Sequence, residues 1–173
     1  MGASKENAKL TLVEFADFRC IHCKHAAPTI KAFLNAHPDV RLEFQTWALD
    51  GECNSKISSA NGASCLLGRS VWCAEKQNQK GWAAHEYIFE QEMYPALESV
   101  KQALPAIAKA AGMTAEAMLA CTDSEEAKAA VRAQADLGGT LNIQGTPAIF
   151  ANGRLLPGGQ VLQVLREAHG SVR

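Results

Sequence analysis

The stretch from Phe18 to His25 reads FRCIHCKH, and the interpretation of the whole chain depends on it. Cys20 and Cys23 are separated by two residues, with His22 between them and His25 close behind. Such a cluster occurs in half of a zinc site, in a structural disulfide, and in a pair that exchanges electrons with other molecules. The residues that precede and follow the stretch distinguish these possibilities.

The composition is that of an ordinary globular domain. Of 173 residues, 47% are hydrophobic and 20% are charged, which argues against a disordered chain. The formal net charge of −1 gives no electrostatic reason to expect a nucleic-acid or anionic-membrane partner. No apolar run approaches the ~18 residues of a membrane span. The leader, MGASKENAKL, is too polar for a secretory signal, so we expect a mature or excised domain without direct membrane insertion.

The segments around the two cysteines predict a strand, a helix and a second strand. Residues 9–17, KLTLVEFAD, are apolar-rich and indicate a buried strand that ends just before Cys20. Residues 21–36 place their apolar side chains on one helical face, and Pro28 should kink this helix. Residues 40–49 alternate apolar and polar side chains, as a strand does. The three elements predict a right-handed βαβ crossover.

The middle of the chain predicts helices. It is rich in Ala, Lys, Glu and Gln and poor in β-branched residues. Asp123, with Glu126 three residues later, resembles a capping box for the last helix, and Gly138-Gly139 should end that helix. The expected helices span residues 58–67, 70–79, 83–92, 99–111, 114–120 and 123–137.

The C-terminal part returns to strands. The letters AIF, a turn at Asn152-Gly153 and the letters RLL predict a two-residue hairpin, and QVLQVLREAH predicts a closing helix. The order is therefore βαβ, helices, ββα, which belongs to the α/β class. We expect residues 1–55 and 138–173 to form one discontinuous domain, with residues 56–137 as an all-helical insertion after the second strand.

Two of the three interpretations of the cysteine pair are weak. A zinc site needs four ligands, but there is no second CxxC and the other histidines are scattered, so we expect no metal. A structural disulfide between Cys20 and Cys23 would close a very small loop, with little entropic benefit.

The redox interpretation has direct physical support. Cys20 stands where a strand ends and a helix begins, and the unpaired N–H groups and macrodipole at that end stabilise a thiolate. The imidazole of His22 can add a donor or a charge, which lowers the pKa of Cys20 further below the ordinary value of about 8.5. Cys23, one turn deeper, is shielded and suited to resolve a mixed disulfide. The sequence therefore predicts a redox pair.

These features together resemble a known family. The βαβ–ββα order, the CxxC after the first strand and Thr146-Pro147 before the third strand resemble the thioredoxin fold. The helical insertion resembles the DsbA-type thiol:disulfide oxidoreductases, in which EFxxFxCPHC is usual; this chain has EFADFRCIHC. ADFRCxHCKHAAP and the extra cysteines are also similar to DsbA-like domains associated with vitamin K epoxide reductase-type membrane partners.

The resemblance implies roles for single catalytic residues. Cys20 matches the exposed nucleophile, Cys23 its buried partner, and His22 the residue that favours a reduced, anionic Cys20. Glu14 matches a buried glutamate that exchanges protons with the deeper cysteine. A buried carboxyl should have a raised pKa suited to that exchange, whereas a carboxylate at a strand edge would simply face solvent.

The resemblance also implies a substrate-binding surface. Thr146-Pro147, with Gly145 before it, matches a cis-proline loop that lies against the sulfurs and pairs with an extended peptide. Ile21 stands where the family has proline. Because β-branched Ile is less suited to the first helical position, it should change the redox potential while leaving a thiolate-forming pair.

The other four cysteines allow three pairings. Cys53 and Cys65 flank the polar loop NSKISSANGAS, which a bridge could close easily. That pairing leaves Cys73 with Cys121, tying two helices of the insertion. The six cysteines also favour an oxidising compartment, so we expect a periplasmic or other extracytoplasmic location.

The expected function is that of a protein-disulfide oxidoreductase that introduces disulfide bonds into reduced or misoxidised polypeptides without a cofactor. Its reoxidising partner would be a membrane quinone-linked enzyme, similar to DsbB or vitamin K epoxide reductase. The alternatives are a disulfide isomerase or reductase kept reduced, and a non-enzymatic peptide-binding or chaperone module. Isomerases usually need a dimerisation module and none is visible, so we expect a monomer.

Overall fold

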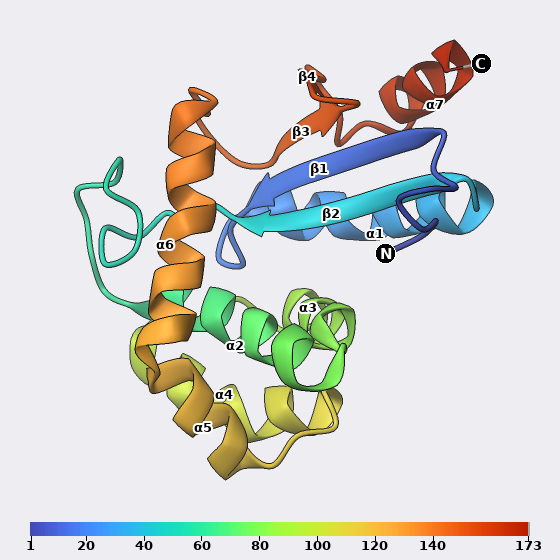
Figure 1. Ribbon diagram of the computed structural model, residues 1–173. Helices are drawn as coiled ribbons and strands as arrows, with labels where there is room; N and C mark the ends of the chain where they lie inside the picture. Colours follow the sequence, from blue (N-terminus) through green and yellow to red (C-terminus); the bar gives the residue numbers. More distant parts are fainter. Residues whose placement is uncertain (173) are drawn as a thin grey trace. The chain divides into compact units, whose positions relative to one another are not determined.

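Four strands form one sheet in the computed structural model, which describes residues 1–172 (Figure 1). The strand order is β2-β1-β3-β4. β1 and β2 run in the same direction (Figure 1), whereas β3 is antiparallel to β1 and β4 is antiparallel to β3. Glu14 on β1 lies opposite Ile149 on β3. The strands are β1 (Leu10–Ala16), β2 (Val40–Thr46), β3 (Ala148–Ala151) and β4 (Arg154–Leu155).

Helices α1 (Ile21–Ala36) and α7 (Leu162–Ser171) complete the part that we call the sheet unit. This unit comprises residues 1–16, residues 20–45 and the chain from Ile143 onward. α1 buries one apolar face, and α7 packs against α1 around a fully buried Leu165. Pro28 lies inside α1. The buried residues of α1 are Cys23, Ala26, Ile30, Phe33 and Leu34.

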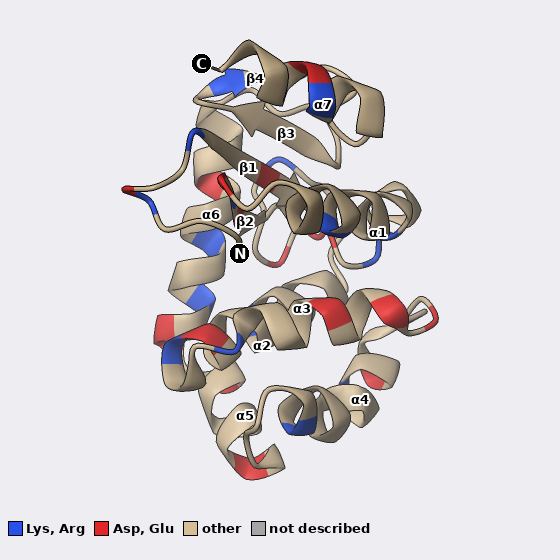
Figure 2. Ribbon diagram, turned by 90° about the vertical axis from the view of Figure 1, so that its right-hand side faces the viewer, with Lys and Arg blue, Asp and Glu red and all other residues tan. Residues whose placement is uncertain are grey.

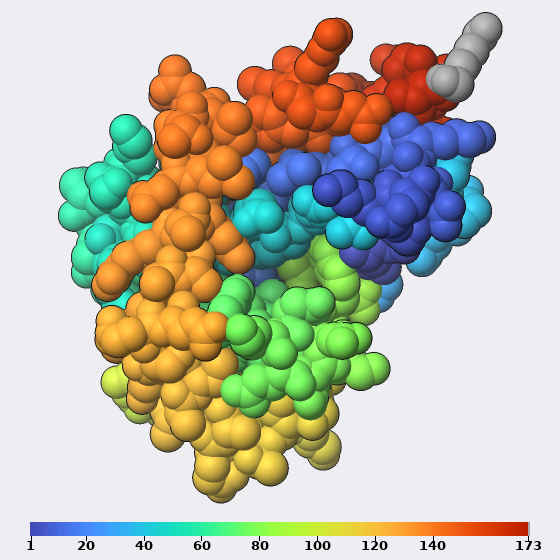
Figure 3. Space-filling model, viewed as in Figure 1, coloured from blue at the N-terminus to red at the C-terminus, as the bar shows by residue number. Residues whose placement is uncertain are grey.

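The N-terminal residues cover the outer edge of β2. The Met1 ammonium donates to the Leu42 carbonyl at 2.8 Å, and Gly2 forms an antiparallel bridge with Arg41. Figure 3 shows the N-terminal segment in dark blue. Gly2 has a φ of +84°, and a Cβ there would collide with the Val40 carbonyl oxygen. The pairing occupies backbone groups that an open edge strand would otherwise offer to another chain.

Five helices form the second part, the helical unit, which comprises residues 17–19 and 46–142. Residues 63–78 form one helix, where the sequence pattern predicted two, at 58–67 and 70–79. The last helix of this unit begins after Ser124 and not at Asp123. The Ser124 hydroxyl accepts a hydrogen bond from the Ala127 N–H. The helices are α2 (Ala63–Asn78), α3 (Gly81–Glu90), α4 (Leu97–Ala110), α5 (Ala115–Asp123) and α6 (Glu125–Thr140).

The glycine pair does not stop α6, contrary to the expectation. The helix runs through Gly138-Gly139 to Thr140, and Gly138 is buried. A glycine costs only about 1 kcal/mol in a helix, so packing readily outweighs it. The Thr140 hydroxyl donates to the Leu137 carbonyl at 2.7 Å within the last turn.

The boundaries between the units differ from those drawn on the sequence. The expected strand 40–49 ends at Thr46, whose N–H donates to the Gln134 side chain of α6 at 2.8 Å. The Leu49 N–H donates to the Asp17 carboxylate at 2.8 Å. Residues 17–19 and 46–55 belong to the helical unit, as do residues 138–142, which include the end of α6.

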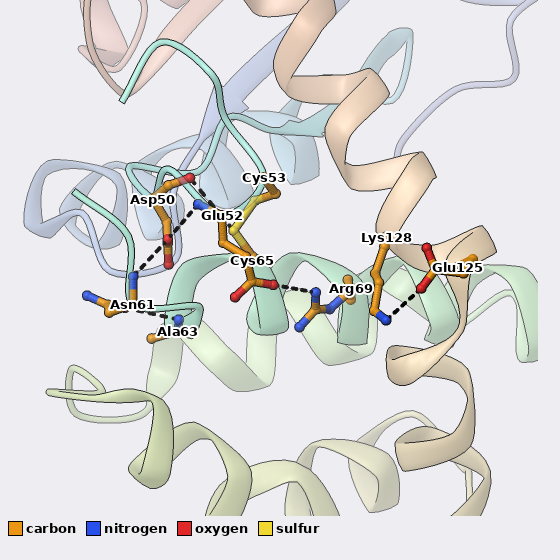
Figure 4. A network of polar contacts seen from close by, with 9 residues as sticks. All are labelled: Asp50, Glu52, Cys53, Asn61, Ala63, Cys65, Arg69, Glu125 and Lys128. Carbon is orange, nitrogen blue, oxygen red and sulfur yellow. Dashed lines mark hydrogen bonds and ion pairs between the residues drawn. A yellow bond between two sulfur atoms is a disulfide. The ribbon is translucent and has the colours of Figure 1, made fainter. Parts of the chain in front are cut away.

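The loop between β2 and α2 is organised around a buried carboxylate (Figure 4). Asp50 is 1% exposed, and its Oδ1 accepts hydrogen bonds from the N–H groups of Glu52 and Asn61. Asn61 in turn accepts from the Ala63 N–H at 3.0 Å, at the start of α2. Glu52 pairs with Arg69 at 2.8 Å. These bonds explain why residues 58–62 form a loop and not the first turns of a helix.

Charges of both signs are distributed along both units (Figure 2). This agrees with the net charge of −1 and leaves no electrostatic reason to expect nucleic-acid binding. Within residues 1–172, no helix is both long and apolar enough to cross a bilayer.

Candidate active site

Cys20 lies at the first position before α1. Its backbone is extended, with φ −84° and ψ 119°, and its carbonyl accepts the Lys24 N–H at 3.0 Å, which begins the helical hydrogen bonds. Cys20 retains 7% exposure, whereas Cys23, one turn further on, has none. Both residues are present as thiols. The first cysteine therefore has an opening to solvent that the second lacks.

The surroundings of Cys20 stabilise its thiolate. Its pKa is lowered to about 5, chiefly because the Cys23 side chain donates a hydrogen bond to it. Burial opposes this shift, and the side chain of Thr146 and the backbone groups of Cys23 and His22 add to it. His22 thus contributes through its backbone, where the sequence suggested its imidazole; its side chain is exposed. The Cys23 side chain therefore supplies most of this stabilisation, and the backbone N–H groups at the helix start supply a smaller part.

A low pKa at Cys20 favours the reduced state. The folded-state pKa lies below the ordinary value of 9.0, so the thiolate's contribution to the stability of the reduced protein is full above pH 9.0. It is lost as the pH falls to about 5. At neutral pH the reduced form keeps part of this stabilisation, which the disulfide form cannot have. A pair of this kind gives its disulfide away readily.

The segment before β3 lies against the same sulfur. The Cys20 thiol donates to the Thr146 carbonyl at 3.4 Å, and the Thr146–Pro147 peptide bond is cis. Ile21 is 45% exposed and adjoins the reactive sulfur in sequence. At Gly145 a Cβ would meet nothing within 4 Å, so space alone does not require glycine there. The nucleophile and the proline loop therefore meet within the sheet unit.

Glu14 is buried in the middle of β1. It is 3% exposed, and burial raises its pKa to about 8. A carboxyl with this pKa is mostly protonated at neutral pH and can both release and accept a proton there. The structure thus places Glu14 in the interior and not at a solvent-facing strand edge.

Sequence reasoning missed Arg19, the residue directly before Cys20. Its guanidinium donates to the carbonyls of Tyr94 and Pro95 at 2.8 and 2.9 Å and to the Asn61 side chain at 3.2 Å. These groups belong to the helical unit, which also contains Arg19. The partners lie 42–76 residues away in sequence, so no local pattern indicates them. These bonds tie residue 19 to the loops that precede α2 and α4 in the helical unit.

The other four cysteines form two disulfides, both within the helical unit. Cys53 bonds to Cys65 and Cys73 bonds to Cys121. These are the pairs named from the sequence. The first fastens the loop of Figure 4 to α2, and the second joins α2 to α5.

Comparisons with known proteins agree with this geometry. Residues 11–170 match the model of the family described as DSBA-like thioredoxin domain. The chain is 27% identical to disulfide bond formation protein D of Bacillus subtilis over 158 residues, which are 88% of this chain and 67% of that protein.

Solved structures share the fold. Oxidised BdbD from Bacillus subtilis superposes with a TM-score of 0.78 at 24% identity, covering 99% of this chain and 91% of that one. A periplasmic thioredoxin-like protein from Salmonella enterica gives a TM-score of 0.73 at 25% identity, covering 97% and 85%. Since the family model spans nearly the whole chain, from β1 to α7, this protein belongs to the DSBA-like thioredoxin domain family and is a thiol:disulfide oxidoreductase.

Proposed function

We propose that the protein is a dithiol oxidase that works through Cys20 and Cys23. The observation that carries this proposal is the lowered pKa of Cys20, about 5, at the start of α1. A stabilised thiolate is a good leaving group, so the Cys20–Cys23 disulfide is a strong oxidant. Ile21, Gly145, Thr146 and Pro147 would contact the substrate backbone around the exposed sulfur.

The exchange proceeds in two balanced steps. A substrate thiolate attacks the Cys20 sulfur, forming a mixed disulfide and releasing Cys23 as a thiolate that takes up a proton. A second substrate thiolate then attacks the substrate sulfur of the mixed disulfide and expels the Cys20 thiolate. The substrate loses two electrons and gains a disulfide, and the enzyme becomes a dithiol. We assign to Glu14 the supply and removal of the Cys23 proton, because its pKa of about 8 suits both directions.

The setting of this reaction follows from the same chemistry. Two disulfides in the helical unit support an oxidising, extracytoplasmic compartment. The substrates would be reduced or misoxidised polypeptides. A membrane quinone-linked enzyme, similar to DsbB or to vitamin K epoxide reductase, would restore the Cys20–Cys23 disulfide. We propose that the enzyme acts as a monomer.

Three assays test the direction of the reaction. The redox potential, from equilibration with glutathione, should lie closer to about −120 mV than to about −270 mV. The oxidised protein should form disulfides rapidly in reduced, unfolded ribonuclease and should reduce insulin poorly. Strong insulin reduction, or rescue of scrambled but not of reduced ribonuclease, would instead show a reductase or isomerase. Inactivity in every assay would leave the non-enzymatic peptide-binding module as the remaining alternative.

Replacing Glu14 with glutamine should remove a pH dependence of stability. The folded-state pKa of about 8 exceeds the ordinary 4.5, so the favourable neutral form is fully present below pH 4.5 and is lost as the pH rises through about 8. Glu14→Gln should therefore match the native protein in acid, gain an advantage in stability as the pH rises from 4.5 towards about 8, and keep the full advantage above that pH. Urea unfolding of the oxidised proteins across this range measures the difference.

The catalytic part of the Glu14 proposal has its own readout. The variant should form the mixed disulfide more slowly, and the pH dependence of that rate near 8 should flatten. Glu92→Gln, at an exposed position, is the matched control and should change neither measurement. A stability difference that is equal at every pH, or an unchanged rate profile, would argue against the assignment.

A further inference from the structure

Three side chains that could bind a metal meet at the end of the sheet unit where α1 stops. His37 directly follows α1, Asp39 precedes β2, and His169 stands in the last turn of α7. The nearest potential ligand atoms all lie within 4.8 Å of one another. His169 Nε2 is already 2.9 Å from Asp39 Oδ1, and the two imidazole ring centres are 4.3 Å apart. Among residues 1–172, no other group of three His, Cys, Asp or Glu side chains meets this distance.

The donor set selects a class of ion. Two imidazole nitrogens and one carboxylate oxygen suit zinc and its neighbours in the first transition row, whereas calcium and magnesium prefer oxygen ligands alone. At metal–ligand bonds of about 2.0–2.1 Å, ligand atoms of a tetrahedral site lie about 3.3 Å apart. The longest separation here must shorten by about 1.5 Å, which small side-chain rotations can supply. All three residues are half-buried, so water can occupy the fourth position.

The surroundings hold the two imidazoles in place. The Phe33 ring of α1 lies 4.5 Å from the His37 ring and 6.2 Å from the His169 ring, measured between centres. Phe33 is itself 1% exposed, so its position is fixed by the core. Two ligands oriented against a rigid ring lose less freedom on binding than two surface side chains would.

We propose that His37, Asp39 and His169 bind one divalent transition-metal ion, with zinc as the reference ion, and that the bound ion fastens α7 to the end of α1. The ion replaces the hydrogen bond between His169 and Asp39 with bonds to both residues. It therefore stabilises the folded sheet unit by mass action.

One nearby charge opposes the ion. The Lys9 ammonium lies 3.6 Å from Asp39 Oδ2, and its side chain is 68% exposed. Because it is so exposed, the ammonium can move into water when a cation arrives, at some cost in affinity. Lys9→Met should consequently bind zinc several-fold more tightly than the native chain.

The proposed site is independent of the redox pair. α1 has 16 residues, which places Cys20 about 24 Å from the His37 end of the helix. The oxidised protein, in which Cys20 and Cys23 form a disulfide, has no free thiol at this pair. Its use therefore excludes zinc binding by these two cysteines. His22 and His25, three residues apart on exposed positions of α1, are the main rival chelating pair.

Isothermal titration of oxidised, tag-free protein with zinc tests the proposal. The native chain should bind one zinc ion with micromolar affinity and should unfold at a higher temperature when zinc is present. His169→Gln and Asp39→Asn should each weaken binding by at least about tenfold. His37→Gln should do the same while leaving the His169–Asp39 bond intact, so a loss of affinity there cannot come from breaking that bond. Circular dichroism without metal verifies that each variant is folded.

The rival histidine pair supplies the control for the titration. The double variant His22→Gln/His25→Gln should retain native affinity, and cobalt, as a spectroscopic substitute, should give visible bands with the native chain that His37→Gln abolishes. No one-to-one binding at millimolar zinc would overturn the proposal. So would unchanged affinity in all three ligand variants, or loss of binding in His22→Gln/His25→Gln alone.

Discussion

Replacing Cys20 with serine should reduce disulfide transfer to reduced ribonuclease to the uncatalysed background, a loss on the order of 10⁴ or more. The hydroxyl of serine stays protonated at neutral pH and cannot form a disulfide, so neither exchange step can occur. The fold should survive, because serine is a favoured residue at the position before a helix and its hydroxyl can still donate to the Thr146 carbonyl and accept from the backbone N–H groups of the first helical turn. The initial rate of ribonuclease oxidation is the measurement.

Cys23→Ser is the matched control for this variant. It retains the Cys20 thiol but lacks the residue that resolves a mixed disulfide. With scrambled, disulfide-containing ribonuclease as the substrate, the Cys20 thiolate attacks a substrate disulfide and expels one substrate sulfur as a thiolate. The mixed disulfide should therefore accumulate in Cys23→Ser and be visible on a non-reducing gel, whereas Cys20→Ser should give none. Retained activity in Cys20→Ser, or trapping by Cys20→Ser alone, would show that the roles of the two cysteines are wrongly assigned.

Removing the Cys73–Cys121 disulfide should destabilise the helical unit more than removing the Cys53–Cys65 disulfide. The sequence separations are 48 and 12, and the unfolded chain gains more freedom when the longer loop is opened. Loop-closure entropy gives losses of about 4 and about 3 kcal/mol in the free energy of unfolding. Urea unfolding of the two double alanine variants measures both values.

The two variants are controls for each other. Each removes two sulfurs and leaves small cavities, and Cys65 and Cys73 are equally buried, so cavity costs largely cancel in the comparison. The redox potential of Cys20–Cys23 should stay unchanged in both, since the pair lies in the other unit. Equal losses, or a larger loss from the shorter loop, would mean that loop entropy does not dominate.

The sequence predicted those parts of the site whose residues are close together in the chain. Cys20 and Cys23 follow a strand and open a helix, so their relative depth follows from helix geometry alone. The DSBA-like family was likewise recognisable from the CxxC, Thr146-Pro147 and the helical insertion together.

What the sequence could not show depends on residues brought together by folding. Arg19 finds its partners beyond residue 60, and His169 meets Asp39 across 130 residues. The ends of α2 and α6 were misplaced for the same reason. The Asp50 bonds keep residues 58–62 out of the helix, and the packing of Gly138 lets α6 pass through two glycines.

The placement of the sulfurs also protects the enzyme from its own chemistry. Each structural disulfide has one cysteine, Cys65 or Cys73, with no exposed surface, whereas Cys20 keeps an opening to solvent. In the folded state a substrate thiolate meets the partly exposed sulfur of each bridge, Cys53 or Cys121, and has to expel the covered Cys65 or Cys73 as a thiolate in the interior, where burial disfavours the charge. Exchange at the structural bridges is therefore unfavourable while the protein is folded, and repeated turnover at Cys20–Cys23 leaves them in place.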